Sequence, residues 1–232
     1  ISCDIYDPVN QKPKGVIVFV HGMSLRGRRD PRQIEVCECF LSCGYRVLAP
    51  EFPEISETKI EYRTVLRIRE SLKLLQQNQE ISLGLKLGIF SVSFSASMVM
   101  LAAADKAMSN HISSIYSLGA YADVDSALKF IMESDEADNY STLVIFHNYL
   151  ELTEIGSNEN IKNAMLSLIA DNSLEHDPPT FPDYYAKLNQ QEQVELDQIR
   201  NDAGFRKRQS KIMFNKDLSW LKKWSVRQNA KD

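Results

Sequence analysis

A serine stands between a strand-like and a helix-like segment near the middle of the chain. Residues 85–90 form a short apolar run interrupted by Lys86, which is typical of a buried parallel strand. Residues 97–106 are rich in Ala, Met and Leu, which are strong helix formers. The connecting run is Ser91-Val92-Ser93-Phe94-Ser95, with a small residue two positions before and two positions after Ser93. This pattern predicts a nucleophile elbow, a strained turn that exposes the Ser93 hydroxyl at the carboxyl end of the strand.

The elbow pattern leaves two alternatives open. Glycine normally fills both flanking positions, so the serines at 91 and 95 make this a relaxed form of the motif. The serine run could instead be the N-terminal cap of an ordinary helix. The frame could also slide so that Ser95 is the nucleophile, flanked by Ser93 and Ser97. That frame lengthens the strand and delays the helix, so Ser93 is the preferred nucleophile.

A second motif lies two strands earlier in the chain. The buried run 17–20 ends in His21-Gly22-Met23. Ester or amide hydrolysis places negative charge on an oxygen, and two main-chain N–H groups must already point at that position. The residue after the nucleophile, Phe94, supplies one in an elbow architecture, and the loop after the His-Gly strand supplies the other, for which Met23 is the candidate. Gly22 allows close approach of the backbone.

Together these segments resemble the α/β-hydrolase superfamily, in particular its esterases and lipases. The resemblance is carried by 18–31, 44–55 and 88–98, whose order and spacing look like the strands usually numbered three, four and five, and it covers about residues 1–125. It implies Ser93 as nucleophile and Met23 and Phe94 N–H groups as the oxyanion hole. It also implies a supporting role for His21, which in the family hydrogen-bonds nearby backbone and is not the catalytic base.

The elements that must position these residues alternate between strand and helix in the first half of the chain. This alternation predicts an α/β fold with a mostly parallel sheet, flanked by helices and joined by right-handed crossovers. The expected strands are 1–6, 15–20, 45–50, 85–90 and 112–118. The expected helices are 31–42, capped by Asp30 and stopped by Gly44, then 57–77, a helix from the elbow to about 108, and one from 125 to about 131.

The second half of the chain has a helical pattern. Residues 143–146 could form a strand, but the apolar spacing continues in a helical rhythm to 152, which predicts a helix. Further helices are expected at 160–170, 184–200 and 211–224. We therefore expect a partial α/β-hydrolase core at 1–137 and a helical cap, or lid, at 138–232.

The sequence contains no obvious catalytic acid and base for the serine. The family places an acid and then a histidine after later strands. His111 lies at the wrong end of its strand, and His147 lies in an apolar helical stretch. His176 is loop-borne and follows Asp123 and Asp125 in the required order, so an in-chain triad stays an alternative. The preferred interpretation is a fragment whose acid and base lie beyond residue 232, and whose start in mid-strand marks a missing N-terminus.

Composition narrows the classes of partner. The chain has 44% hydrophobic and 25% charged residues and a net charge of −4, which favours neither nucleic acid nor an anionic membrane, and no apolar run is long enough to span a bilayer. The basic segment 200–232 and the arginines at 26, 28 and 29 are interpreted as solvated, although the arginines could meet an acidic substrate group. The cysteines at 37, 39 and 43 match no zinc template, which favours free thiols in a reducing, cytoplasmic compartment. No metal or cofactor is expected, and the oligomeric state is not predicted.

The sequence thus predicts a serine hydrolase that acts on carboxylic esters, with a small acyl compound as substrate. The alternative is a catalytically silent α/β-hydrolase-fold protein that binds a ligand or partner, favoured by the serine-for-glycine changes and the missing base. An acyltransferase on the same scaffold is a third, weaker possibility. The substrate itself is set by pocket side chains that the sequence does not identify.

Overall fold

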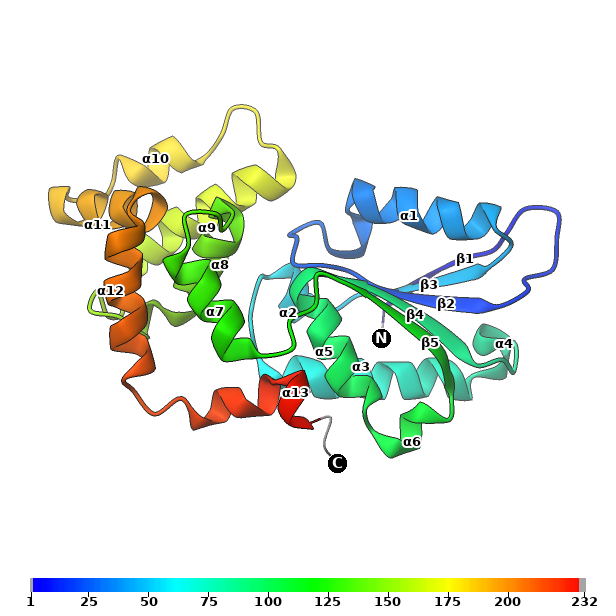
Figure 1. Cartoon of the computed structure of the whole chain (residues 1–232). Helices are drawn as coiled ribbons and strands as arrows, with labels where there is room; N and C mark the ends of the chain where they lie inside the picture. Colours follow the sequence, from blue (N-terminus) through cyan, green and yellow to red (C-terminus); the bar gives the residue numbers. More distant parts are fainter. Residues whose placement is uncertain (1, 230–232) are drawn as a thin grey trace. The chain divides into compact units, whose positions relative to one another are not determined.

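The computed structural model describes residues 2–229 and divides the chain into two compact units (Figure 1). The first, here called the sheet unit, contains residues 2–123 and 223–229. The second, here called the helical unit, contains residues 124–222.

The sheet unit contains a five-stranded sheet with the order β1-β3-β2-β4-β5. Strand β1 is antiparallel to its neighbour β3, and the other pairs are parallel. The predicted strands and the predicted mostly parallel α/β fold are confirmed. The bounds are Cys3–Tyr6 (β1), Val16–Val20 (β2), Arg46–Pro50 (β3), Leu87–Val92 (β4) and Ile112–Leu118 (β5).

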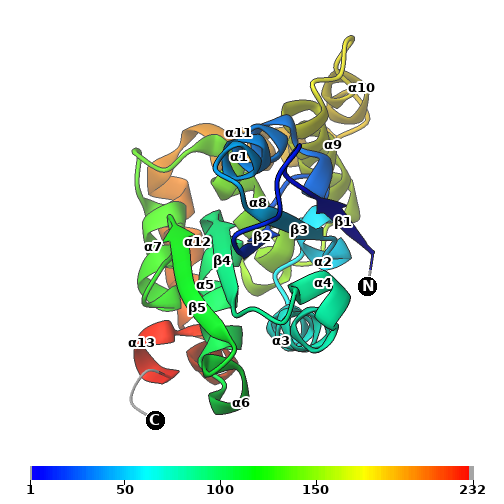
Figure 2. The ribbon, with the colours of Figure 1, turned by 90° about the vertical axis from the view of Figure 1, so that its right-hand side faces the viewer.

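Helices cover both faces of this sheet (Figures 1 and 2). Helix α1 (Pro31–Ser42) lies on one face, and α3 (Tyr62–Gln77) and α5 (Ser93–Ala103) lie on the other. Cys37 of α1 forms a buried cluster with Phe19 and Val47 of the sheet, and partly buried neighbours of this cluster include Phe90. Removal of this apolar surface from water on both faces of the sheet is the main stabilising term, and it fixes where the strands end.

The predicted signals at the ends of α1 are confirmed. The Asp30 carboxylate accepts from the Arg32 N–H at 3.0 Å, and Pro31 occupies the first helical position, where no intrahelical donor is needed. At the other end, Gly44 has φ of +85°, a left-handed conformation that glycine adopts without steric cost. Helix α1 therefore begins and ends where its terminal residues dictate.

Two predicted helices have different bounds in the structure. The predicted helix 57–77 begins later, as α3 at Tyr62, and a separate short helix, α2 (Pro53–Ser56), precedes the predicted start. Thr58, in the turn between α2 and α3, has φ of +55°. The predicted elbow helix ends at Ala103, and α6 (Lys106–Ser109) begins anew after Asp105, whose carboxylate accepts from the Ala107 N–H at 2.8 Å. The spacing of apolar residues continues across both turns, so the sequence pattern does not reveal them. The backbone at these turns is not helical.

The helical unit is built from α7 (Val124–Glu133), α8 (Asn139–Tyr149), α9 (Glu159–Leu174), α10 (Phe181–Tyr185), α11 (Gln190–Asn201) and α12 (Ala203–Phe214). Helix α8 buries the four consecutive residues Leu143 through Phe146, as expected for a helix surrounded by others. It packs against α7, α9 and α11. The prediction of helix rather than strand at 143–152 is confirmed for α8, which a 3₁₀ turn at Leu150–Leu152 follows.

The helix bounds near the C-terminal end differ from the predicted ones. The predicted helix 184–200 is divided into α10 and α11, because Asn189 begins α11 with a reciprocal capping box to Glu192. The predicted helix 211–224 begins earlier, as α12, because Asp202 accepts from the Phe205 N–H and caps it. A 3₁₀ turn at Ser219–Trp224 and α13 (Val226–Asn229) follow.

Residues 223–229 belong to the sheet unit. The Arg227 N–H donates to the Ala122 carbonyl at 2.9 Å, and the buried Trp224 ring packs edge-on against Tyr62 with centroids 6.0 Å apart. The function of the helical unit as a cap stays a prediction. No helix within residues 2–229 has both the length and the apolar character needed to cross a bilayer.

Candidate active site

Ser93 occupies the junction between β4 and α5 with a strained backbone. Its φ is +58°, a left-handed conformation that costs a non-glycine residue roughly 1–2 kcal/mol. The residue is exposed, while Val92 before it is still extended, with φ of −130° and ψ of 151°. The main chain therefore turns sharply at Ser93 and presents the hydroxyl to solvent at the carboxyl end of a central parallel strand.

Two glycines make close contact with this turn. A Cβ built on Gly22, after β2, would lie 3.1 Å from Val92 Cγ2 and 3.8 Å from Ser93 Cβ. A Cβ built on Gly119, after β5, would lie 3.8 Å from both the main-chain N and the Cα of Ser93. The carboxyl ends of β2, β4 and β5 thus converge on Ser93.

The flanking serines are accommodated without glycine. Ser91 is fully buried, and its Oγ lies 3.3 Å from the Oγ of Ser117 on the neighbouring strand β5. Ser95 is fully buried as well, and its Oγ donates to the Val92 carbonyl at 2.7 Å. Each hydroxyl that replaces a glycine hydrogen therefore has a partner, so the relaxed motif carries no unsatisfied polar group at these two positions.

The same contacts decide between the two serine frames in geometric terms. The Ser95 hydroxyl is buried and bonded back to the strand, and Ser95 lies in the first turn of a regular helix. Ser93 alone of the pair is exposed and has positive φ. The geometry of a nucleophile elbow belongs to Ser93, while its catalytic function stays a prediction.

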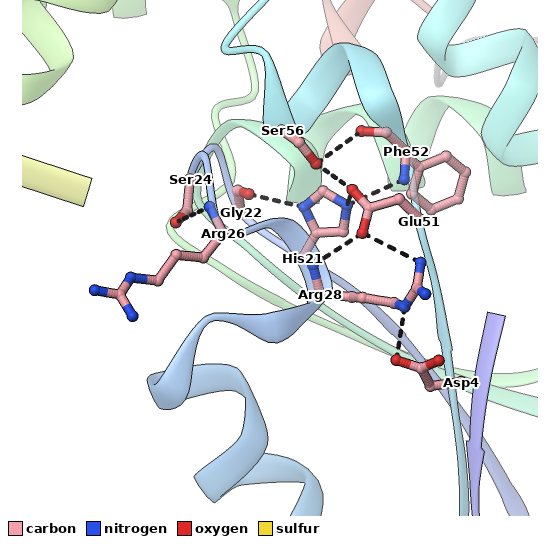
Figure 3. A network of polar contacts seen from close by, with 9 residues as sticks. All are labelled: Asp4, His21, Gly22, Ser24, Arg26, Arg28, Glu51, Phe52 and Ser56. Atoms are coloured by element: carbon pink, nitrogen blue, oxygen red, sulfur yellow. Dashed lines mark hydrogen bonds and ion pairs between the residues drawn. The ribbon is translucent and has the colours of Figure 1, made fainter. Parts of the chain in front are cut away.

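His21 is buried and uses both ring nitrogens within the fold (Figure 3). Its Nε2 lies 3.1 Å from the Phe52 main-chain N, which can only donate, so Nε2 is the acceptor. Its Nδ1 is therefore the protonated nitrogen and donates to the Gly22 carbonyl at 3.0 Å. Burial lowers the pKa of His21 and outweighs both the Gly22 hydrogen bond and the Glu51 carboxylate, which lies 3.5 Å from Nε2. The ring is neutral and acts as a bridge between the ends of β2 and β3.

The loop after His21 is held by an ionic network (Figure 3). The Arg28 guanidinium donates to Asp4 at 2.6 Å and lies 3.4 Å from Glu51, whose carboxylate also accepts from the Arg28 main-chain N–H at 3.2 Å. The Ser56 hydroxyl donates to the same carboxylate. Of the three arginines that could have met an acidic substrate group, Arg28 is therefore committed to the fold. The network fixes the segment that follows the proposed oxyanion donor.

The proposed oxyanion donors lie on either side of the elbow. Phe94 is the second residue of α5, and N–H groups in the first turn of a helix have no partner within that helix. Met23 directly follows Gly22, the residue in close contact with the elbow. The helix N-terminus adds a favourable field for developing negative charge. The assignment of both N–H groups to an oxyanion hole stays a prediction.

A further loop, not evident from the sequence, is held against the elbow helix by side-chain contacts. The Ser97 hydroxyl accepts from the Tyr121 main-chain N–H at 2.7 Å and donates to the Tyr121 carbonyl at 3.0 Å. The Tyr121 ring packs against the Phe94 ring, with centroids 4.7 Å apart. The loop after β5 therefore lies against the first turns of the elbow helix, next to Ser93. The only signal in the sequence was a serine one helical turn after the predicted nucleophile.

No histidine of the sheet unit's described residues is a candidate base for Ser93. His21 is neutral and doubly hydrogen-bonded, and the carbonyl of His111 accepts from Leu87 at the start of β4, at the opposite end of the strands. A polar cleft of about 360 Å³ also lies at that opposite end, lined in part by Arg69, Asp105 and His111. It is separate from the elbow.

The remaining two histidines belong to the helical unit. The His176 ring nitrogen Nδ1 lies 2.9 Å from Asp171, whose carboxylate also accepts from the main-chain N–H groups of Thr180 and Phe181. His147 lies on α8. Within residues 2–229, no cluster of three or more His, Cys, Asp or Glu side chains is arranged to hold a metal ion.

In the elbow motif, a serine with a strained backbone lies between a central parallel strand and the following helix. Ser93 has this arrangement between β4 and α5. The fold is a mostly parallel α/β sheet flanked by helices, and it has the elbow geometry that the predicted α/β-hydrolase type of fold requires. No family model and no curated protein matches the chain. Among solved structures, the chain is similar to brefeldin A esterase, described as a bacterial homologue of human hormone sensitive lipase. The identity is 14% and the TM-score 0.46, over 98% of this chain and 73% of that one.

Proposed function

We propose that this chain is a serine hydrolase that acts on carboxylic esters, with Ser93 as nucleophile. The observation that carries the proposal is the backbone of Ser93, an exposed non-glycine residue with φ of +58° between β4 and α5. A conformation that costs free energy persists only where the surrounding structure enforces it, and such residues concentrate at functional sites. Here Gly22, Gly119 and two hydrogen-bonded serines supply that enforcement.

The proposed reaction has two steps. The Ser93 Oγ attacks the acyl carbon, its proton goes to a base, and the alkoxide leaves as an alcohol after taking up a proton. Water then attacks the acyl-serine, releases the carboxylic acid and restores the hydroxyl. In both steps the charge on the carbonyl oxygen is held by the N–H groups of Phe94 and Met23, while His21 and Gly22 support the loop that carries Met23.

A second candidate is a catalytically silent protein of the same fold that binds a ligand or a partner. The specific observation in its favour is the absence of a candidate base among the histidines of the sheet unit's described residues. A serine without its base is a poor nucleophile at neutral pH. Removal of a triad member typically leaves about 10³–10⁴-fold catalysis over water, from the oxyanion hole and binding.

The two candidates differ in whether Ser93 reacts at all. The test measures release of p-nitrophenol from p-nitrophenyl acetate, with and without added imidazole, for the parent chain, Ser93→Ala and Ser109→Ala. Ser109 is an exposed serine on α6 and serves as the matched control. Imidazole supplies a general base, so a serine that lacks only its base should be rescued.

The hydrolase proposal expects slow release by the parent chain, acceleration by imidazole beyond the reagent's own rate, and loss of both in Ser93→Ala alone. Mass spectrometry after a fluorophosphonate probe should place the label on Ser93. If imidazole adds no Ser93-dependent rate and the probe leaves Ser93 unmodified, the silent binding protein is the correct assignment. Release that persists in Ser93→Ala and is lost in Ser95→Ala would instead restore the shifted frame.

A further inference from the structure

Two aromatic residues lie next to Ser93 in the sheet unit. Phe94 follows Ser93 directly in α5, and its ring packs against the Tyr121 ring with centroids 4.7 Å apart. A separation in this range is favourable for two aromatic rings. Both residues are half-buried, so part of their apolar surface stays accessible and does not join the buried core. Phe94 and Tyr121 are here called the aromatic pair.

Contacts of the loop after β5 hold the aromatic pair beside Ser93. A Cβ built on Gly119 of this loop would lie 3.8 Å from the main-chain N and the Cα of Ser93. One helical turn further along α5, the Ser97 hydroxyl accepts from the Tyr121 N–H and donates to the Tyr121 carbonyl. Because residues four positions apart share a helix face, the loop runs along the face of α5 that contains Ser93 and Ser97. Main-chain contacts that do not involve the Tyr121 ring thus fix the position of Tyr121.

The Phe94 ring lies at the same end of α5 as the Ser93 hydroxyl. In an α-helix each Cα–Cβ bond is tilted toward the N-terminus, and a long side chain covers the surface N-terminal to its own Cα. Phe94 is the second residue of α5, so its side chain extends toward the N-terminal end of the helix. Ser93 is exposed at that end. The aromatic pair and the proposed nucleophile therefore belong to one local surface.

The proposed reaction brings the substrate to this surface. In that mechanism the acyl oxygen accepts from the Phe94 N–H, at about 2.9 Å. The acyl chain is bonded to the same carbon as that oxygen and stays attached to Ser93 in the acyl intermediate, whereas the alcohol departs. The group that remains beside Phe94 through both steps is therefore the acyl chain. The ring faces are apolar, and each methylene group removed from water is worth about fourfold in an equilibrium constant.

We propose that the aromatic pair binds the acyl chain of the substrate and makes the protein prefer longer apolar acyl groups over short ones. This inference rests on the proposed function and names its substrate class, which is esters of apolar carboxylic acids with several methylene groups. Phe94 contributes its main-chain N–H to the oxyanion and its ring to the acyl chain, whereas Tyr121 contributes its ring alone. Tyr121 is therefore the specificity-determining residue whose replacement leaves every group proposed for catalysis in place.

The first test compares kcat/KM for p-nitrophenyl hexanoate and p-nitrophenyl acetate, which share a leaving group and differ only in the length of the acyl chain. Imidazole is present at one fixed concentration, and the rates of Ser93→Ala are subtracted. The parent chain should favour the hexanoate by at least about tenfold, because the added methylenes are partly removed from water. Tyr121→Ala should lower this ratio by at least about fivefold. Tyr116→Ala is the matched control, since Tyr116 is 59% exposed on β5 and its ring stacks on Phe90.

The ratio of the two rates is insensitive to incomplete folding of a variant. It is measured within one preparation, so a smaller folded fraction lowers both rates by the same factor. If Tyr121→Ala and the parent chain both show Ser93-dependent release with an equal ratio, the inference is overturned and the proposed function stands. A ratio that falls equally in Tyr116→Ala also overturns the inference.

The second test requires no turnover. Hexanamide keeps the carbonyl and the acyl chain of the hexanoate but resists hydrolysis. In saturation-transfer NMR with irradiation of the aromatic protons of the protein, the hexanamide methyl group should receive a signal that is mostly lost in Tyr121→Ala and unchanged in Tyr116→Ala. If this pattern holds while no ester gives Ser93-dependent release, the proposed hydrolysis is wrong and the aromatic pair still binds an acyl chain. Transfer that is equal in Tyr121→Ala and the parent chain contradicts the inference, whatever the result for Ser93.

Discussion

The Nε2 atom of His21 accepts a hydrogen bond from the main-chain N–H of Phe52 at 3.1 Å, although the Glu51 carboxylate lies only 3.5 Å from the same atom. An N–H donor and a protonated Nε2 cannot share that position, so the hydrogen bond requires a neutral ring. Burial of the ring lowers the pKa of His21. The same burial places the ring inside the fold, where its role is structural. His21 thus ties the end of β2 to the end of β3.

Protonation of His21 should therefore destabilise the fold. Because its folded pKa lies below the ordinary value of 6.5, the unfolded chain binds the proton first, and stability is full above about pH 6.5 and falls as the pH decreases. The slope contributed by one proton approaches about 1.4 kcal/mol per pH unit. His21→Gln cannot be protonated, so urea unfolding should show a shallower loss of stability between pH 6.5 and 5. His111→Gln, at a half-buried histidine, is the control, and an unchanged slope in His21→Gln would contradict the prediction.

Gly27 and Gly84 offer a matched pair for testing how tightly the loop after β2 is packed. Both have positive φ, of +53° and +67°, so alanine brings similar backbone strain of roughly 1–2 kcal/mol to each. At Gly27 the new Cβ would also lie 2.5 Å from Glu51 Oε1, whereas at Gly84 nothing lies within 4 Å. We expect Gly27→Ala to lower the free energy of unfolding by at least about 1 kcal/mol more than Gly84→Ala. Equal losses would show that Glu51 and Ser56 move aside freely.

The elbow could be predicted from the sequence because its signal is local. Small residues around Ser93, between an apolar run and a helix-forming run, dictate both the position of the turn and its strained backbone. The five strands were predictable for a related reason, since a parallel strand buried on both faces reads as a continuous apolar segment. The apolar patterns of edge strand β1 and of half-exposed β5 are weaker. Turn residues next to each strand nevertheless indicate where it begins and ends.

The packing around the elbow was not predictable from local pattern. Arg28 looks like a solvated loop arginine until the fold brings it to Asp4 and Glu51, residues 24 and 23 positions away in the chain. Ser97 looks like one more small residue of a helix until β5 delivers Tyr121 to it. Pairing of this kind depends on how strands are ordered in the sheet, and spacing along the chain does not encode that order.

Ser97 should contribute to the stability of the elbow through its two hydrogen bonds. Ser97 is fully buried, and Ser97→Ala removes its hydroxyl from both the N–H and the C=O of half-buried Tyr121. The expected loss is about 1–3 kcal/mol in the free energy of unfolding. Ser109→Ala, which removes an exposed hydroxyl bonded to the Lys106 carbonyl, should cost a few tenths at most. Urea denaturation of both variants measures the difference, and equal costs would argue that the Ser97 contacts contribute little.

Asp171 holds the loop that follows α9, and acid should release it. Burial raises the pKa of its carboxyl, but hydrogen bonds from Thr180, Phe181 and His176 outweigh burial and lower the pKa from 3.8 to about 2. A lowered pKa stabilises the fold fully above the unfolded value, and this stabilisation is lost as the pH falls from about 4 through about 2.

Asp171→Asn should therefore destabilise the helical unit by roughly 1–2 kcal/mol at pH 7 and become equivalent to the parent chain near pH 2. Asp177→Asn changes the same charge at an exposed position of the same loop and serves as the control. Limited proteolysis between residues 175 and 181 across this pH range measures loop release directly. In the parent chain cleavage should rise below about pH 4, whereas in Asp171→Asn it should already be rapid at pH 7. A parent loop that stays protected down to pH 2 would show that the carboxylate is not what holds it.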